Sequence, residues 1–148
     1  MVTLGSLKNE MESLKKAHGC GSYEYSDPSE KFTYCTTSHF REVKQKEKYG
    51  IYMISQHDTQ EVLYIGKGGT IDSWGRFKKQ DIPERLKAPK GGNIPADKWF
   101  RDLLQEKGPL LIEYVFLPRS KSPAFVEAVL LQAYLNEHHR LPYRNKSL

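Results

Sequence analysis

Short apolar runs joined by polar segments predict the strands of this chain. Residues 49–54 and 62–65 are mostly apolar, and the polar stretch 55–61 connects them. Runs of this length that contain β-branched and aromatic residues are typical of strands, so the pattern predicts a β-hairpin with a tyrosine on each strand. A further apolar run predicts a third strand over residues 110–117.

Helices are predicted where apolar residues recur at intervals of three and four. This spacing indicates an amphipathic helix over residues 4–17 and another helix over residues 96–107. A third helix is predicted to begin at Ser122-Pro123, where a hydroxyl cap precedes a proline in the first turn, and to run to about His139.

The segment between the hairpin and the helix over residues 96–107 is rich in turn-forming residues. A glycine pair after the second strand favours a turn, and either Asp72 or Ser73 is suited to cap a short helix that carries Arg76. Residues 81–95 contain three prolines and two glycines, so they are predicted to form a long basic loop.

These elements divide the chain into two parts. Residues 1–45 are predicted to be an N-terminal extension, in which the first helix is followed by a loop over residues 22–31 and an extended segment over residues 32–40. Residues 46–148 carry strand, strand, helix, helix, strand and helix in that order. This order indicates a domain of the α/β (α+β) class.

Composition places the chain among globular proteins. Its 148 residues, 38% hydrophobic and 28% charged, suffice for one domain with a single core. No apolar run is long enough to cross a bilayer, and no charged-then-apolar leader opens the chain. We therefore expect an intracellular, cytoplasmic protein with no membrane partner.

The positive charge is concentrated in one region. The chain carries a net charge of +5, and residues 67–90 hold seven basic and three acidic side chains. A basic block favours a polyanionic partner such as nucleic acid, because neutralising phosphates releases counterions. The alternative is a solvated, lysine-rich face.

Four residues raise the question of a zinc site. His18, Cys20, Cys35 and His39 are of the residue types that bind zinc, but no Cys-x-x-Cys motif is present. Two thiols in an intracellular protein are expected to stay reduced. Ordinary buried or exposed side chains are therefore the preferred interpretation, with structural zinc as the alternative.

Glu127 is the single residue with the most unusual surroundings. It is the only charged side chain between Ala124 and Leu135 in the last predicted helix. A carboxylate in a largely buried helix needs a partner, and a metal ion is among the best. The alternative is an acid on the one wet face of the helix, paired with an arginine or lysine.

Two tripeptides, Gly50-Ile51-Tyr52 and Tyr64-Ile65-Gly66, lie on the two predicted hairpin strands. Together with the elements that follow them, they resemble the signature of the GIY-YIG nuclease superfamily, whose members cut nucleic-acid phosphodiesters with a divalent metal. The resemblance covers residues 46–148. It implies a small three-stranded antiparallel sheet flanked by helices, here with an N-terminal helical extension.

The resemblance also implies catalytic roles. Glu127 matches the metal-binding glutamate, for which Mg²⁺ or Mn²⁺ is expected. Tyr52 would orient or deprotonate the attacking water, and Tyr64 would bond near the phosphate. Arg76 would contact the scissile phosphate, because guanidinium can stabilise charge developing on phosphorus. Lys67 would assist in stabilising that charge.

Further residues are implied to bind substrate. Lys78 or Lys79 would replace Arg76 if the alignment is shifted, and Asn145 would touch a phosphate or steady the site. Many relatives carry a histidine or tyrosine one turn after the arginine, where this chain has Gln80. Glutamine cannot relay a proton, which leaves Tyr52 as the better base.

The resemblance therefore implies a DNA endonuclease dependent on Mg²⁺ or Mn²⁺, of compact restriction type or phage type. Two alternatives remain: a structure-specific repair nuclease, and a nucleic-acid-binding module that has lost activity. A single site cuts one strand, so double-strand cleavage predicts a dimer or higher oligomer.

Overall fold

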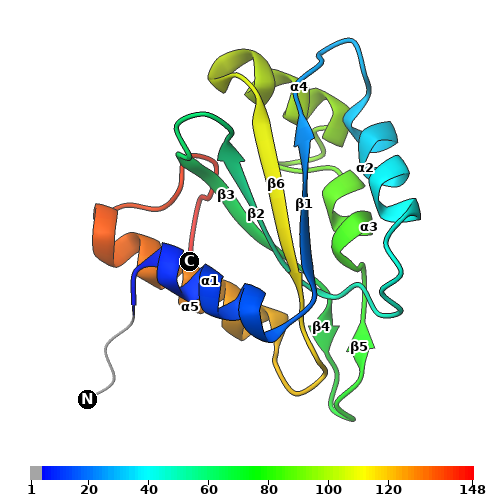
Figure 1. Cartoon of the computed structure of the whole chain (residues 1–148), viewed down its shortest axis with the longest axis vertical. Coiled ribbons are helices and arrows are strands. Elements are labelled where there is room, and N and C mark those ends of the chain that lie inside the picture. The colour runs from blue at the N-terminus through cyan, green and yellow to red at the C-terminus, as the bar shows by residue number, and fades with distance from the viewer. Residues whose placement is uncertain (1–4) are drawn as a thin grey trace.

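Four strands form one antiparallel sheet at the centre of the structure, a computed structural model that describes residues 5–148. The elements in chain order are α1 (Leu7–Ala17), β1 (Cys20–Tyr25), α2 (Phe32–Arg41), β2 (Gly50–Gln56), β3 (Val62–Gly68), β4 (Thr70–Ile71), β5 (Phe77–Lys78), α3 (Ile82–Lys87), α4 (Ala96–Lys107), β6 (Leu110–Phe116) and α5 (Pro123–His138). The strands lie in the order β1-β6-β2-β3, and β4 pairs with β5 in a separate hairpin (Figure 1). The fold is thus of the mixed α/β class, as predicted.

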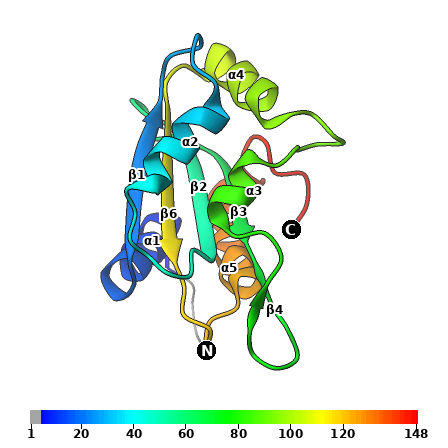
Figure 2. The ribbon, with the colours of Figure 1, turned by 90° about the vertical axis from the view of Figure 1, so that its right-hand side faces the viewer.

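Helices cover both faces of the sheet. Helices α1 and α5 lie on one face, and α2, α3 and α4 lie on the other (Figures 1 and 2). Successive side chains of a strand point to opposite faces. Ile51 and Met53 of β2 therefore pack with α5, whereas Tyr52 and Ile54 pack with α3 and α4. Because both faces are covered, every residue of β2 is buried, which explains its continuous apolar run.

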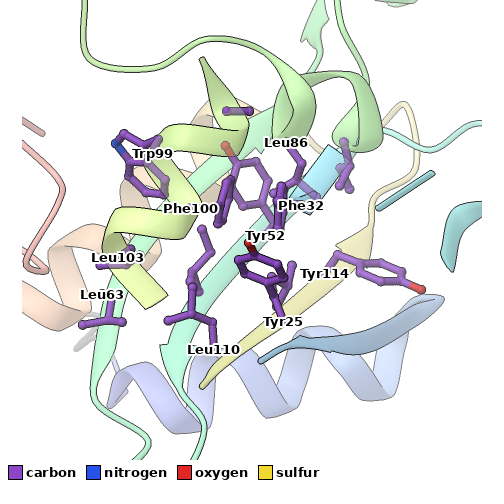
Figure 3. Packing of buried hydrophobic residues seen from close by; sticks show 14 of the residues in the cluster. Tyr25, Phe32, Tyr52, Leu63, Leu86, Trp99, Phe100, Leu103, Leu110 and Tyr114 are labelled. Atoms are coloured by element: carbon purple, nitrogen blue, oxygen red, sulfur yellow. The ribbon is translucent and has the colours of Figure 1, made fainter. Parts of the chain in front are cut away.

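Aromatic rings dominate the core beneath α2, α3 and α4. The rings of Phe32 and Phe100 stack with centroids 3.4 Å apart, and Tyr52 lies in the same cluster (Figure 3). Trp99 meets Phe100 edge-on at 4.8 Å. The hairpin tyrosine Tyr52 is only 1% exposed, so the sheet and this cluster fix its ring firmly.

Several predicted elements are confirmed. The hairpin appears as β2 and β3, the third predicted strand as β6, and the predicted helices as α4, α5 and α1. The predicted start of α1 at Leu4 lies outside the described residues. Within residues 5–148, no helix has both the length and the apolar character needed to span a bilayer.

The prediction of a three-stranded sheet is wrong, because the N-terminal segment supplies a fourth strand. Strand β1 occupies part of the predicted loop over residues 22–31 and pairs with β6 along its whole length. The segment predicted to be extended, residues 32–40, is helix α2. Its buried residues Phe32, Thr36 and Phe40 are spaced by four, so they form one face of a helix.

The structure of residues 72–95 also differs from the prediction. No helix forms over residues 72–78, because the Asp72 carboxylate accepts the backbone N–H groups of Trp74 and Arg76, both at 2.9 Å, and closes a tight turn. That turn joins β4 to β5. A helix forms instead inside the predicted loop: α3 begins with a capping box in which Asp81 and Glu84 cap each other.

Glycine is required at one position in each tripeptide. A Cβ added to Gly66 would lie 2.5 Å from the ring of Tyr52, its partner across the hairpin. A Cβ added to Gly50 would lie 2.0 Å from the Val115 carbonyl oxygen. Both contacts are far inside van der Waals distance, so these glycines allow β2 to pack closely against its two neighbours.

We expect the Gly66→Ala substitution to lower the free energy of unfolding by about 1–3 kcal/mol, because the new methyl group displaces a fully buried tyrosine ring. Urea unfolding followed by circular dichroism measures the loss. Gly19→Ala is the matched control, since a Cβ there meets its nearest atom, on the side chain of Gln45, at 3.4 Å. Equal stability of the two variants would contradict the packing argument.

Candidate active site

A cavity of about 550 Å³ opens where the end of β3, α3 and α5 meet. Its lining includes the five residues Tyr52, Tyr64, Lys67, Arg85 and Glu127. They come from β2, β3, α3 and α5 and span 75 positions of sequence, from Tyr52 to Glu127. Four of the five were predicted as catalytic residues, and the fold brings those four together.

A second cavity of about 330 Å³ adjoins the first. Tyr64 and Glu127 line both cavities, so the carboxylate of Glu127 lies at their junction. The second cavity carries basic groups of its own, from Lys90 and Arg144 among others. Glu127 is therefore bordered by positive side chains on two sides.

Helix α5 holds Glu127 in place through its well-formed start. The hydroxyl of Ser122 accepts the backbone N–H of Phe125 at 3.3 Å, and Pro123 occupies the first turn. One turn further along the helix, Leu130 and Leu131 are buried against the sheet. The half-buried Glu127 thus projects from a helix that is anchored on either side of it.

The Glu127 carboxylate has no hydrogen bond or ion pair to any residue in the described range 5–148. Burial raises its pKa above the usual value, and the positive charges of Lys67 and Arg85 act in the opposite direction. A half-buried carboxylate with an open coordination sphere is suited to a hard divalent cation. Mg²⁺ is commonly held by one or two carboxylates, with water and phosphate oxygens as its other ligands. The residues present therefore fit such an ion.

The two hairpin tyrosines face the same cavity. Their ring centroids are 6.0 Å apart. Burial is the main cause that raises the pKa of Tyr52 well above its usual value, and the neighbouring Tyr64 adds to the effect. Burial also raises the pKa of Tyr64. Both phenols are therefore protonated at neutral pH, which suits them to donate hydrogen bonds, and ionisation of Tyr52 as a base is disfavoured in this state.

The arginine in the cavity is Arg85, not the predicted Arg76. Arg76 lies at the tip of the β4–β5 hairpin, where its 63% exposed side chain pairs with Asp72 at 3.4 Å. Arg85 is half-buried on α3, and its positive charge lowers the pKa values of Tyr52 and Glu127. Sequence reasoning missed Arg85 because residues 81–95 were predicted to be a loop. The Asp81–Glu84 capping box is the signal that could have found the helix.

The predicted lysines are placed differently from one another. Lys67 lines the cavity at the end of β3, and its ammonium donates to the Gly69 carbonyl at 3.4 Å. Lys79 also lines the cavity and has a left-handed backbone with φ of 67°, which is uncommon for a non-glycine residue. Lys78 is exposed on β5 and lines neither cavity, while Gln80 lines the first.

Asn145 has a structural role that accounts for its amide. Its Oδ1 accepts the backbone N–H of Ile65 and its Nδ2 donates to the Ile65 carbonyl, both at 2.9 Å. The side chain thus binds the open edge of β3 as another strand would. Asn145 lines the second cavity, and it steadies the strand that carries Tyr64 and Lys67.

Lys90 is a buried cation that the sequence did not single out. Although only 8% exposed, its ammonium donates to the carbonyls of Arg85, Leu86 and Ala88 at 2.9, 3.0 and 3.1 Å. It therefore satisfies the carbonyls at the end of α3, the helix that carries Arg85. Burial, with a smaller contribution from Arg85, lowers the pKa of Lys90 to about 7.

We expect the Lys90→Met substitution to destabilise the protein by about 1–3 kcal/mol at pH 9, because the carbonyls at the end of α3 lose the amine that donates to them. The loss should be smaller at pH 6. Between pH 7 and 10.5 the unfolded chain holds the lysine proton and the folded chain releases it, so folding gains stability from this group as pH rises. Urea unfolding at both pH values measures the difference. Lys98→Met, which removes a 62% exposed lysine of α4, is the control. An equal loss at both pH values would contradict a depressed Lys90 pKa.

The four candidate zinc ligands have separate neighbours. His18 lies 3.3 Å from the Lys121 ammonium, Cys35 contacts Glu30 at 3.2 Å, and His39 contacts the Tyr114 hydroxyl at 2.7 Å. Cys20 lies 3.8 Å from the Lys15 carbonyl. Across residues 5–148 no group of three or more histidine, cysteine, aspartate or glutamate side chains is arranged to hold a metal. A metal ion at Glu127 would therefore be held by fewer than three such side chains, with water or phosphate oxygens as its other ligands.

Comparisons of the chain with protein-family models, with curated proteins and with solved structures found no match.

Proposed function

We propose that this protein is a metal-dependent endonuclease that hydrolyses DNA phosphodiester bonds at the cavity around Glu127. The observation that carries the proposal is the meeting of an unpaired, half-buried carboxylate with Arg85, Lys67 and two tyrosines in one cavity. Phosphoryl transfer requires cations that neutralise a developing negative charge and donors that position the phosphate. This group of residues supplies both.

The charges around the site favour a nucleic-acid strand as the substrate. Arg85, Lys67 and Lys79 line the first cavity, and Arg144, which pairs with Glu106, and Lys146 line the second. A strand laid across Glu127 would place a phosphate at each cavity, and each neutralised phosphate adds affinity through counterion release. This distribution of charge also predicts that binding weakens steeply as salt concentration rises.

Each residue of the cavity has a role that follows from its chemistry. Glu127 would hold Mg²⁺ or Mn²⁺, which when bound neutralises charge on the scissile phosphate and the leaving oxygen. The planar guanidinium of Arg85 binds non-bridging phosphate oxygens and stabilises the charge that grows on them. Lys67 adds a second positive charge. The protonated hydroxyls of Tyr52 and Tyr64 orient the phosphate and the attacking water by hydrogen bonding.

Cleavage of supercoiled plasmid tests the proposal. We expect nicked or linear product with Mg²⁺ and no product when EDTA is present, because the carboxylate of Glu127 cannot act on phosphate without a cation. Discrete linear fragments would identify a sequence-specific, restriction-type enzyme, and linear product formed at the same time as nicked product would indicate two cooperating subunits. Absence of cleavage with Mg²⁺, Mn²⁺ and several DNA forms, while DNA is still bound, would overturn the enzyme proposal.

A further inference from the structure

The β4–β5 hairpin extends from the candidate active site and projects beyond the end of the sheet (Figures 1 and 2). Trp74 lies in its turn and is 80% exposed, more than any other large hydrophobic side chain of the described residues. At the other end of the hairpin, Thr70 and Lys79 line the cavity that contains Glu127. The hairpin therefore connects an exposed indole ring directly to the candidate site.

The hairpin holds Trp74 on a rigid support. The Asp72 carboxylate accepts the N–H groups of Trp74 and Arg76, and the Asp72 backbone N–H donates to the Arg76 carbonyl at 2.9 Å. At the base, the ring of Phe77 stacks on Tyr49 with centroids 4.5 Å apart and planes 14° apart. Because the support is ordered before any partner arrives, little conformational entropy is lost when the indole binds.

The charges beside the indole indicate a polyanionic partner. Arg76, Lys78 and Lys79 follow Trp74 within five positions, and Asp72 is the one acidic side chain of the hairpin. The Asp72 charge is already paired with Arg76. Aromatic rings next to basic side chains are the combination that binds nucleic acids, since bases stack on the ring while the cations neutralise phosphates.

We propose that the β4–β5 hairpin is a second DNA contact, in which Trp74 stacks on a base near the cleavage site while its lysines bind the phosphates that lead into the cavity. The inference rests on DNA being the substrate. A base inside an intact duplex presents no free face, so this contact opens a base step or uses a base that is already unpaired. The hairpin therefore favours DNA that is distorted, mismatched or single-stranded beside the scissile bond.

The fluorescence of tryptophan provides a direct test without cleavage. The chain has two tryptophans, and the second, Trp99, is only 6% exposed. In EDTA, an oligonucleotide that contains a mismatch should quench the fluorescence and protect it from iodide. The Trp74→Phe variant should show much less of both effects, because its remaining Trp99 is buried, although it lines the second cavity. Quenching of equal size in both proteins would overturn the stacking contact.

A binding measurement tests the energetic importance of the same contact. Trp74→Ala should weaken binding to mismatched DNA by roughly 5- to 100-fold, the usual effect of removing one stacked base. Tyr34→Ala, which removes a 65% exposed ring from α2, is the matched control and should bind as the wild type does.

The possible outcomes separate this inference from the proposed nuclease. If Trp74→Ala binds DNA as tightly as the wild type and still cleaves it, the hairpin contact is wrong. The proposed nuclease function is not contradicted by that result. Absence of DNA binding by the wild-type protein would overturn both. Self-association in sedimentation that is lost in Trp74→Ala would assign the exposed ring to a second copy of the chain, and would also overturn the DNA contact.

Discussion

Replacing Glu127 by glutamine should slow plasmid cleavage about 10³-fold or more, while DNA binding in EDTA stays at the wild-type level. A bound metal supplies several kcal/mol of charge stabilisation in phosphoryl transfer, and the amide cannot replace the carboxylate as its ligand. The side chains have nearly the same size, so the cavity keeps its shape. Time courses with Mg²⁺ concentrations extended into the millimolar range measure the loss.

The same variant should be as stable as the wild type, or more stable, at neutral pH. The folded pKa of Glu127 is raised above its usual 4.5, so folding loses stability as pH rises past that value and the buried group ionises. Glutamine removes this cost. Mg²⁺ should raise the melting temperature of the wild type and leave that of Glu127→Gln unchanged, because only a ligand bound to the folded state stabilises it.

Glu137→Gln is the matched control for both measurements. Glu137 lies on α5 but lines neither of the two cavities around Glu127, so its substitution should leave cleavage and the Mg²⁺ effect unchanged. Full cleavage activity in Glu127→Gln would show that Glu127 takes no part in catalysis. Equal Mg²⁺ stabilisation of the wild type and Glu127→Gln would place the cation elsewhere.

Substitution of Arg85 should have the second-largest effect. Arg85→Ala is expected to lower the single-turnover cleavage rate about 10²- to 10³-fold, the usual cost of removing one preorganised donor to a transition-state oxyanion. Arg85→Lys should recover only part of the rate, because an ammonium lacks the planar pair of donors that a phosphate accepts. Rates at saturating enzyme separate this loss from weaker binding.

Arg76→Ala is the decisive comparison, since the family resemblance implies that Arg76 contacts the phosphate. Its side chain is exposed on the hairpin and lines neither cavity, so its removal should weaken DNA binding and reduce the salt dependence while leaving the saturated rate nearly unchanged. A large loss of the saturated rate in Arg76→Ala, with Arg85→Ala nearly normal, would reverse the assignment.

The elements predicted correctly are those that local patterns determine. The hairpin, β6 and α5 each consist of a continuous apolar segment with a clear boundary, and Ser122-Pro123 marks the start of α5. Glu127 was identified because it is the only charged side chain between Ala124 and Leu135, a pattern that is visible without any tertiary information. Recognising these features requires only residues that are close together in the sequence.

The missed elements depend on partners that are distant in sequence. Phe32 and Tyr34 suggest alternation, but Tyr34 is exposed, whereas Thr36 is buried and its hydroxyl bonds to the Tyr23 hydroxyl of β1 at 2.7 Å. Lysine is usually a surface residue, so the sequence predicts an exposed Lys90. Only the fold places its ammonium over the end of α3. Helix α3 is short and contains a proline in its first turn, so its capping residues were outweighed by the neighbouring turn formers.

The pairing of β1 with β6 has a consequence for the order in which the protein folds. Tyr25 pairs with Leu110 and Cys20 with Val115, so β1 is synthesised long before its only sheet neighbour. At about 5–20 residues per second, the ribosome needs roughly 4–20 s to make the intervening chain. The β2–β3 hairpin can close in microseconds, whereas β1 must wait with its backbone donors unpaired. The nascent N-terminal segment is thus without its sheet neighbour until β6 has been synthesised.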